Sequence, residues 1–136
     1  MLKNVKDELC KSKALQLPVN NFIAFCKIEE IDFPNDARVW KAYAELLKEG
    51  RGDGESSIMA VARYNDHIVA SSNLKDIKNY CSEHKIAYLT TMDILVIALQ
   101  AGINDEAECD YFIYKVKSSG SKLPVNSMQE YFALGK

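Results

Sequence analysis

The hydrophobic positions of the chain change repeatedly between helical and extended spacing. Residues 37–49 place apolar side chains three or four positions apart, which predicts an amphipathic helix. Residues 68–70 and 86–89 are short apolar runs bounded by polar residues, as in buried strands. Residues 28–33 are rich in β-forming side chains and stop at a proline, so a third strand is expected there.

Helices are expected before, between and after these strands. The first begins at a cap residue, Asn4, and its region ends at Pro18. Thr90 and Asp93 have the spacing of a capping box, and from 92 to 99 Asp93 is the only polar residue, so this helix should be buried on nearly every side. Further helices are expected near 55–62, 74–81, 109–116 and 128–132.

Strands that alternate with helices predict βαβ units and a parallel sheet covered by helices on both faces. The predicted fold class is therefore α/β, a three-layer α/β/α arrangement around a small parallel sheet, in a single domain over residues 1–136. Three strands are few for this much helix, which suggests that a strand is missing at the start of the chain.

The composition narrows the class of protein without identifying it. Hydrophobic residues make up 48% of the chain and charged residues 26%, as in ordinary globular domains. A net charge of −2 argues against tight, phosphate-driven binding of duplex DNA, but it allows an enzyme that meets RNA at a metal site. No apolar run approaches the roughly 20 residues of a membrane span. The four cysteines are scattered, and the first residues form no apolar signal region, so we expect reduced thiols in a cytoplasmic protein with no membrane association.

Polar side chains gather around the second predicted strand in a pattern that suits a metal site. Ligands of open parallel sheets collect at the carboxyl ends of the strands. Clustered carboxylates with a nearby amide or hydroxyl offer the hard oxygen ligands that Mg²⁺ or Mn²⁺ prefers, and such an ion can activate water for phosphodiester hydrolysis. The candidates at that end of the sheet are Glu55, Ser71, Ser72, Asn73 and Asp76.

The same residues also have a purely structural explanation. Ser72 or Asn73 can cap the helix that follows, and carboxylates such as Asp76 and Glu55 are favourable near any helix N-terminus. Spacing alone therefore leaves the metal site and the helix caps as open alternatives.

Four segments of the chain resemble the PIN-domain ribonucleases, in particular toxin-like members of toxin–antitoxin pairs. Residues 52–62 resemble the Gly-Glu-Gly-Glu-x-x-Ile-x-x-x-Ala helix start of that family, and residues 68–77 its strand followed by Thr-x-Asn/Asp-x-x-Asp-Phe. Residues 88–95 resemble the next strand and a Gly-Thr-x-x-x-Leu helix start, and residues 5–9 the early Val-x-x-Glu-Leu helix. Their order and spacing extend the resemblance from Val5 to about Phe132.

The resemblance implies a role for each matching residue. Glu8 matches the second acidic metal ligand of the family and Glu55 the third, while Asn73 or Asp76 matches the fourth. Ser71 matches a supporting hydroxyl, and Ser72 stands beside it where many members have an aspartate. The family binds Mg²⁺ or Mn²⁺ and cleaves single-stranded RNA, which would make Glu8, Glu55 and Asp76 the catalytic acids. The resemblance also implies homo-oligomers and an antitoxin protein as a partner.

One departure from the family gives two hypotheses of function. PIN domains open with a strand that carries a first aspartate ligand, whereas here Glu8 follows only seven residues, so the domain resembles an N-terminally truncated member. Either the reading frame starts late and the chain is a metal-dependent endoribonuclease, or the domain is a catalytically inactive binding or assembly module. In the second case the helix over 92–99 and the aromatic stretch 111–114 could face a partner.

Overall fold

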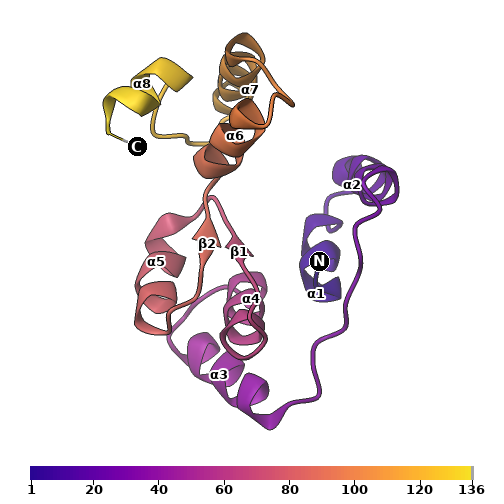
Figure 1. Cartoon of the computed structure of the whole chain (residues 1–136). Coiled ribbons are helices and arrows are strands. Elements are labelled where there is room, and N and C mark those ends of the chain that lie inside the picture. The colour runs from indigo at the N-terminus through magenta and orange to yellow at the C-terminus, as the bar shows by residue number, and fades with distance from the viewer. Residues whose placement is uncertain (136) are drawn as a thin grey trace. The chain divides into compact units, whose positions relative to one another are not determined.

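The computed structural model describes residues 1–135, apart from the side chains of Leu74 and Asp76. The chain divides into two compact units, Met1–Tyr88 and Leu89–Lys136 (Figure 1). Each unit has its own buried core and is described by itself. The single domain expected over residues 1–136 stays a prediction.

The first unit holds five helices and a small sheet. The helices are α1 (Lys3–Leu9), α2 (Lys13–Phe25), α3 (Ala37–Lys48), α4 (Asp53–Tyr64) and α5 (Leu74–Glu83). Strands β1 (Val69–Ala70) and β2 (Tyr88–Leu89) pair as a two-stranded parallel sheet, next to which Val69 N donates to Ala87 O at 2.9 Å. The described chain is mostly helical with this small sheet, which is compatible with the predicted α/β class.

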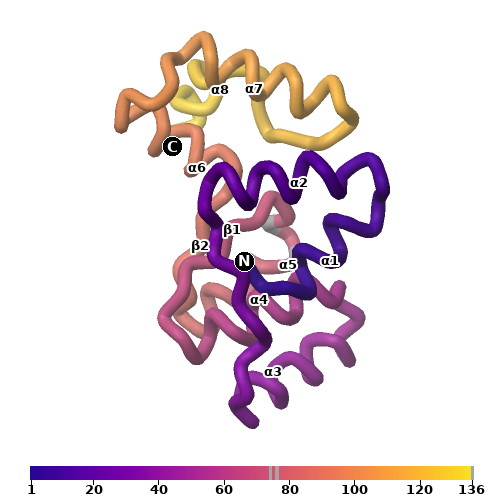
Figure 2. Tube along the Cα trace, turned by 90° about the vertical axis from the view of Figure 1, so that its right-hand side faces the viewer, coloured from indigo at the N-terminus to yellow at the C-terminus, as the bar shows by residue number. Residues whose placement is uncertain are grey.

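Helix α4 lies at the centre of the first unit. Its residues Met59, Ala60, Val61 and Ala62 are buried, and it packs against both α3 and α5. Figure 2 shows α3 and α4 side by side from a second direction. The small side chains of α4 let its neighbours approach closely, and apolar residues of those neighbours complete the core. The fully buried ones are Val39, Leu46, Ile77 and Cys81.

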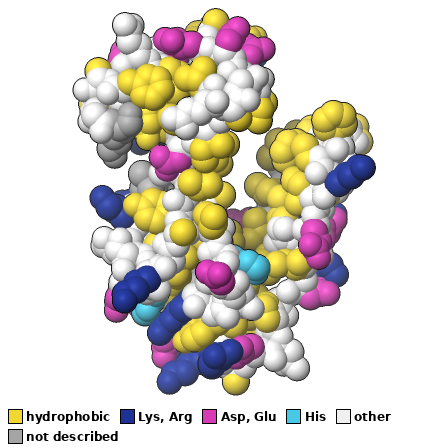
Figure 3. Space-filling view, viewed as in Figure 1, with side chains coloured by type: hydrophobic (Ala, Val, Ile, Leu, Met, Phe, Trp, Pro, Cys, Tyr) yellow, Lys and Arg dark blue, Asp and Glu magenta, His cyan; other side chains and the backbone are white. Residues whose placement is uncertain are grey.

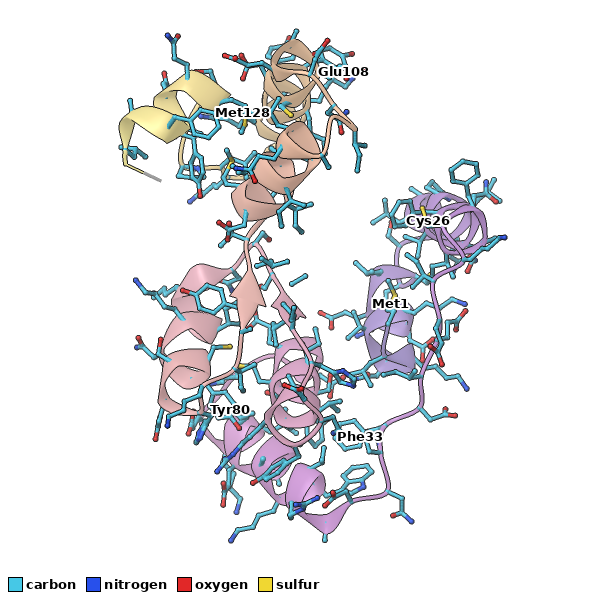
Figure 4. All side chains as sticks on the ribbon, viewed as in Figure 1. Met1, Cys26, Phe33, Tyr80, Glu108 and Met128 are labelled. Carbon is cyan, nitrogen blue, oxygen red and sulfur yellow. The ribbon has the colours of Figure 1, made fainter. Side chains whose placement is uncertain are left out.

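The segment before α3 joins this core without forming the expected strand. Ile31 makes one isolated parallel bridge to Leu2, in which Lys3 N donates to Ile31 O at 3.1 Å. Phe33, labelled in Figure 4, packs its ring 4.5 Å from that of Trp40. The prediction of a strand over 28–33 was therefore wrong, because the segment pairs only at Ile31 and otherwise contributes side chains to the core.

Two helix boundaries near the N-terminus also differ from the prediction. The N-cap position of α1 is Leu2, while Asn4 lies inside the helix. Pro18 lies inside α2 and does not end it. A proline removes one helical hydrogen bond, and here its side chain is exposed, so water can satisfy the carbonyl that loses its partner.

The second unit contains α6 (Thr91–Gln100), α7 (Glu106–Ser118) and α8 (Met128–Ala133). The capping box that Thr90 and Asp93 predict is present, and Asp105 forms a second one with Glu108. Ile113 and Met128 are fully buried in the core of this unit, and Figure 4 labels Met128 between α8 and α7.

Helix α6 is less buried than its sequence suggests. Met92 and Leu95 are buried, whereas Ile94 and Ile97 are 46% and 49% exposed. The prediction of burial on nearly every side was wrong, because α6 packs on the core of its unit through one face only. None of the described helices has both the length and the apolar character that crossing a membrane requires.

The N-cap of α3 gives a prediction about pH. Asp36 accepts a hydrogen bond from Arg38 N at 2.9 Å and pairs with the Arg38 guanidinium at 2.7 Å. These hydrogen bonds from Arg38 lower the pKa of Asp36 from 3.8 to about 2. A lowered pKa stabilises the folded state above about pH 4, and this contribution is lost as the pH falls towards 2.

Asp36→Ala should therefore lower the melting temperature at neutral pH, and its difference from the unmodified chain should shrink below about pH 4 in melts followed by circular dichroism. Asp36→Asn keeps an N-cap acceptor but loses the charge, so its melting temperature should lie between the two. A difference for Asp36→Ala that stays constant from pH 6 to 2 would contradict the assignment.

Candidate functional site

Two of the predicted site residues meet at the carboxyl end of β1. The side-chain amide of Asn73 donates from Nδ2 to Glu55 Oε1 at 2.9 Å. Asn73 occupies the N-cap position of α5, and Glu55 lies in the first turn of α4. The backbone N–H of Asn73 donates to Ser71 Oγ at 3.1 Å, which fixes the turn between β1 and α5. An amide on one helix start thus orients a carboxylate on another.

Glu8 reaches the same first turn of α4 from α1. Gly54 is buried, and a Cβ atom placed on it would lie 2.5 Å from Glu8 Oε2. The carboxylate of Glu8 therefore lies against the backbone of the residue that precedes Glu55. A glycine at this position leaves room for that carboxylate, since any side chain would occupy the same space.

A second set of polar contacts holds α1 against the start of α4. Asn4 donates from Nδ2 to Ser57 Oγ at 2.9 Å and to Asp53 Oδ2 at 3.3 Å. Ser57 is fully buried and donates to Gly54 O at 2.8 Å. The hydroxyl of Tyr43 donates to the other oxygen of Asp53, and this hydrogen bond raises the pKa of Tyr43. Asp53 is thereby bound to α1 and α3, which sets the position from which Glu8 approaches Gly54.

Sequence reasoning did not identify these supporting residues. Asn4 was interpreted as a helix cap, and Asp53 was given no role of its own within the segment 52–62 that resembles the PIN family. The sequence did contain one signal for Asp53. An acidic residue at a helix start is favoured by the helix dipole, so a role for Asp53 at the start of α4 could have been predicted. The partners of Asp53 could not be read from it.

The predicted site residues fall into three groups. Glu55, Asn73 and Ser71 are joined by hydrogen bonds, and Glu8 lies against the adjacent residue Gly54. Ser72 is an exposed residue of the turn after β1. The side chain of Asp76 lies outside the described part of the structure.

The chemistry of the donors suits a hard cation, although the described acids do not form a complete ligand set. The carboxylates of Glu8 and Glu55 and the amide oxygen of Asn73 are the ligand types that Mg²⁺ and Mn²⁺ prefer. Among the residues whose side chains are described, no group of three histidine, cysteine, aspartate or glutamate residues is placed to hold a metal ion. A cation at this site would therefore keep several water ligands, as Mg²⁺ commonly does.

Ser56 is an unusual residue beside this site. Its side chain is fully buried, and within the described structure its hydroxyl has no hydrogen-bond partner. A buried polar group without a partner costs on the order of 1–3 kcal/mol. In the first turn of α4 the acidic site residue Glu55 is thus followed by Ser56, whose buried hydroxyl lowers the stability of the fold.

Comparison of the chain with models of protein families, with curated proteins and with solved structures gives no match. The geometry of the site therefore supplies the grounds for a proposed function.

The hydrogen bonds of Asn4 give a prediction about stability. Asn4→Ala removes the donor to both Asp53 and Ser57 and should lower the free energy of unfolding by about 1–2 kcal/mol, measured by urea denaturation. Asn21→Ala is the matched control, because Asn21 is exposed within α2. Equal effects of the two substitutions would show that these contacts do not hold α1 in place.

Proposed function

We propose that this chain is a PIN-like, metal-dependent endoribonuclease that cleaves single-stranded RNA. The observation that carries the proposal is the meeting of Asn73 with Glu55 at 2.9 Å, beside a glycine that makes room for the Glu8 carboxylate. These residues come from three elements that are far apart in the sequence, and they gather at the strand end where parallel α/β sheets bind ligands. The three-layer arrangement of that family is part of the same proposal.

The residues of the chain have distinct roles in this mechanism. Glu8 and Glu55 would hold a Mg²⁺ or Mn²⁺ ion, which would supply an activated water and neutralise charge on the phosphodiester. Asn73 orients the Glu55 carboxylate through its amide, and Ser71 fixes the backbone of Asn73. Asp76 would complete the acidic set, and Ser72 lies in the turn that precedes α5. We further propose the cytoplasm as the site of action and an antitoxin protein as the partner.

The experiment follows metal binding and cleavage in the same variants. Mn²⁺ should raise the melting temperature of the unmodified chain, with about 2.7 kcal/mol of stabilisation when its concentration is 100 times the dissociation constant. Glu55→Gln should abolish this rise and lower Mn²⁺-dependent cleavage of a single-stranded RNA on the order of 100-fold or more. Glu106→Gln is the matched control, because Glu106 also lies in the first turn of a helix, α7, outside the site.

Gly54→Ala separates the site from the stability of the fold. Alanine stabilises a helix by about 0.8–1.0 kcal/mol relative to glycine. Its Cβ atom would contact the flexible end of the Glu8 side chain, which can move away. The variant should therefore stay folded while its displaced Glu8 carboxylate weakens Mn²⁺ binding. An unmodified chain that neither binds Mn²⁺ nor cleaves RNA would refute the nuclease and leave the inactive module.

A second candidate function, an assembly module, is favoured by the exposed surface of α2. Leu15, Pro18, Phe22 and Phe25 follow a three-four-three spacing, which places them within an arc of about 80° on the helix. Phe22 and Phe25 are 58% and 89% exposed. Hydrophobic side chains gather over α2 in Figure 3. We call these four residues the α2 stripe.

The occupant that we propose for the α2 stripe is a second copy of the chain. A three-four-three spacing is that of the a and d positions in paired helices. A large aromatic side chain buries on the order of 200 Å², so the stripe offers roughly 400 Å² of apolar surface. Two copies would bury roughly 800 Å² from their stripes alone, which is below the roughly 1,200 Å² of stable interfaces, so the dimer that we propose is a weak one.

Phe22→Glu should convert a dimer into a monomer in sedimentation-velocity measurements, because it places a charge at the centre of the α2 stripe. Leu17→Glu is the matched control, since Leu17 is 68% exposed but projects from the other side of α2. A chain that is monomeric at all concentrations, or a dimer that both substitutions disrupt equally, would contradict pairing through the stripe.

A further inference from the structure

The first unit has a polar cavity at the amino ends of its strands. This cavity has a volume of about 470 Å³, and it lies where α3, the end of α4 and the turns that enter β1 and β2 meet. It is distinct from the site of Glu55 and Asn73, which lies at the carboxyl end of β1. The charged and imidazole side chains that line it are Arg38, Arg63, Asp66, His67, His84 and Lys85.

The charge of this cavity is predominantly positive. Arg38, Arg63 and Lys85 are cations at neutral pH, against the single acidic lining residue Asp66. Arg38 is paired with Asp36, which lies outside the lining. Within the described structure neither Arg63 nor Lys85 forms a salt bridge. In Figure 3, Lys and Arg side chains gather over the lower part of the first unit.

Two of these cations converge on one aromatic ring. The guanidinium carbons of Arg38 and Arg63 each lie 5.1 Å from the centre of the Tyr64 ring. Arg63 also donates to the hydroxyl of Tyr80 at 3.4 Å, so neutral groups hold it in place. Both guanidinium groups line the cavity, so an anion bound in it would be attracted by each of them.

The helix dipoles explain only part of this arrangement. Arg63 lies in the last turn of α4 and Lys85 follows the end of α5, where cations are favourable without any ligand. Arg38 lies in the first turn of α3, where the dipole disfavours a cation. The salt bridge with Asp36 offsets this cost for Arg38, and Arg63 and Lys85 are left as the lining cations without a salt bridge in the described structure.

Lys85 occupies its position against the preference of the backbone. Its φ is 56°, in the left-handed region, and Ile86 N donates to Cys81 O at 2.8 Å, as in a Schellman motif. Glycine is the favoured residue there.

Lys27 has the same conformation after α2, with φ 50° and the equivalent hydrogen bond from Ile28 to Ile23, but it does not line the cavity. The chain therefore contains a matched pair of strained lysines.

We propose that the cavity at the amino ends of β1 and β2 binds a phosphate group, held by Arg63, Lys85 and Arg38, on a ligand of up to nucleotide size. Guanidinium groups match the oxygens of phosphate, and the volume falls in the usual range for small-molecule sites. This inference is independent of the proposed nuclease, because it uses none of the residues at the carboxyl end of β1.

The test uses the full chain in metal-free buffer and inorganic phosphate as the first probe, with sodium chloride matched in ionic strength. Phosphate should raise the melting temperature by several degrees and bind measurably in calorimetry. Lys85→Gly should raise the melting temperature without phosphate, because glycine relieves the left-handed strain, yet should bind phosphate at least about tenfold more weakly. Lys27→Gly should give the same gain in melting temperature with unchanged phosphate binding.

Two further arms identify the source of the phosphate. Tighter binding of AMP than of adenosine would assign a small nucleotide. Tighter binding of a 5′-phosphorylated than of a 5′-hydroxyl RNA oligonucleotide would assign an RNA end. Arg63→Gln should weaken either one. The proposal is overturned if phosphate has no effect beyond matched chloride, if Lys85→Gly binds as tightly as Lys27→Gly, or if phosphorylation makes no difference to any probe.

Discussion

The close approach of α1 to the first turn of α4 is the contact on which the candidate site depends. Gly54 has no side chain, so the carboxylate of Glu8 lies directly against its backbone. The hydrogen bonds of Asn4 to Asp53 and Ser57 hold α1 at this distance, and Tyr43 ties the same aspartate to α3. Polar side chains of α1, α3 and α4 therefore find their hydrogen-bond partners at the start of α4. The acidic site is a consequence of how these helices are joined, because the contact with Gly54 brings Glu8 to the turn that carries Glu55.

Local patterns in the sequence predicted local structure well. The capping box of Thr90 and Asp93 depends on residues three positions apart, and the structure contains it. The proximity of Asn73 to the start of α4 follows from the rule that polar residues gather where parallel strands end. The place of Glu8 had to come from a family resemblance, since no local pattern encodes a contact between residues so far apart. The failures have the same origin: Asn4 has a tertiary partner in place of a cap role, and Ile31 pairs with a single residue.

The two ends of the small sheet differ in charge. Helices begin beyond the carboxyl end of β1, where Asn73 and Glu55 lie, and helices α4 and α5 end near the amino ends of the strands, where Arg63 and Lys85 lie. This follows the direction of the helix dipoles. The net charge of −2 conceals the separation, because it sums an acidic edge and a basic edge. The net charge of the whole chain therefore gave little guidance about ligands. The end of the sheet at which each charged residue lies is more informative.

The buried hydroxyl of Ser56 places a limit on how stable the first unit can be. It lies between Glu55 and Ser57 in α4, and in the described part of the structure it is fully buried without a hydrogen-bond partner. Local rules of protein structure are most often broken near functional residues. This position is where an engineer would gain thermal tolerance most readily, because a methyl group fits wherever a hydroxymethyl group already does. The natural residue is therefore the less stable choice in the turn of α4 that carries Glu55.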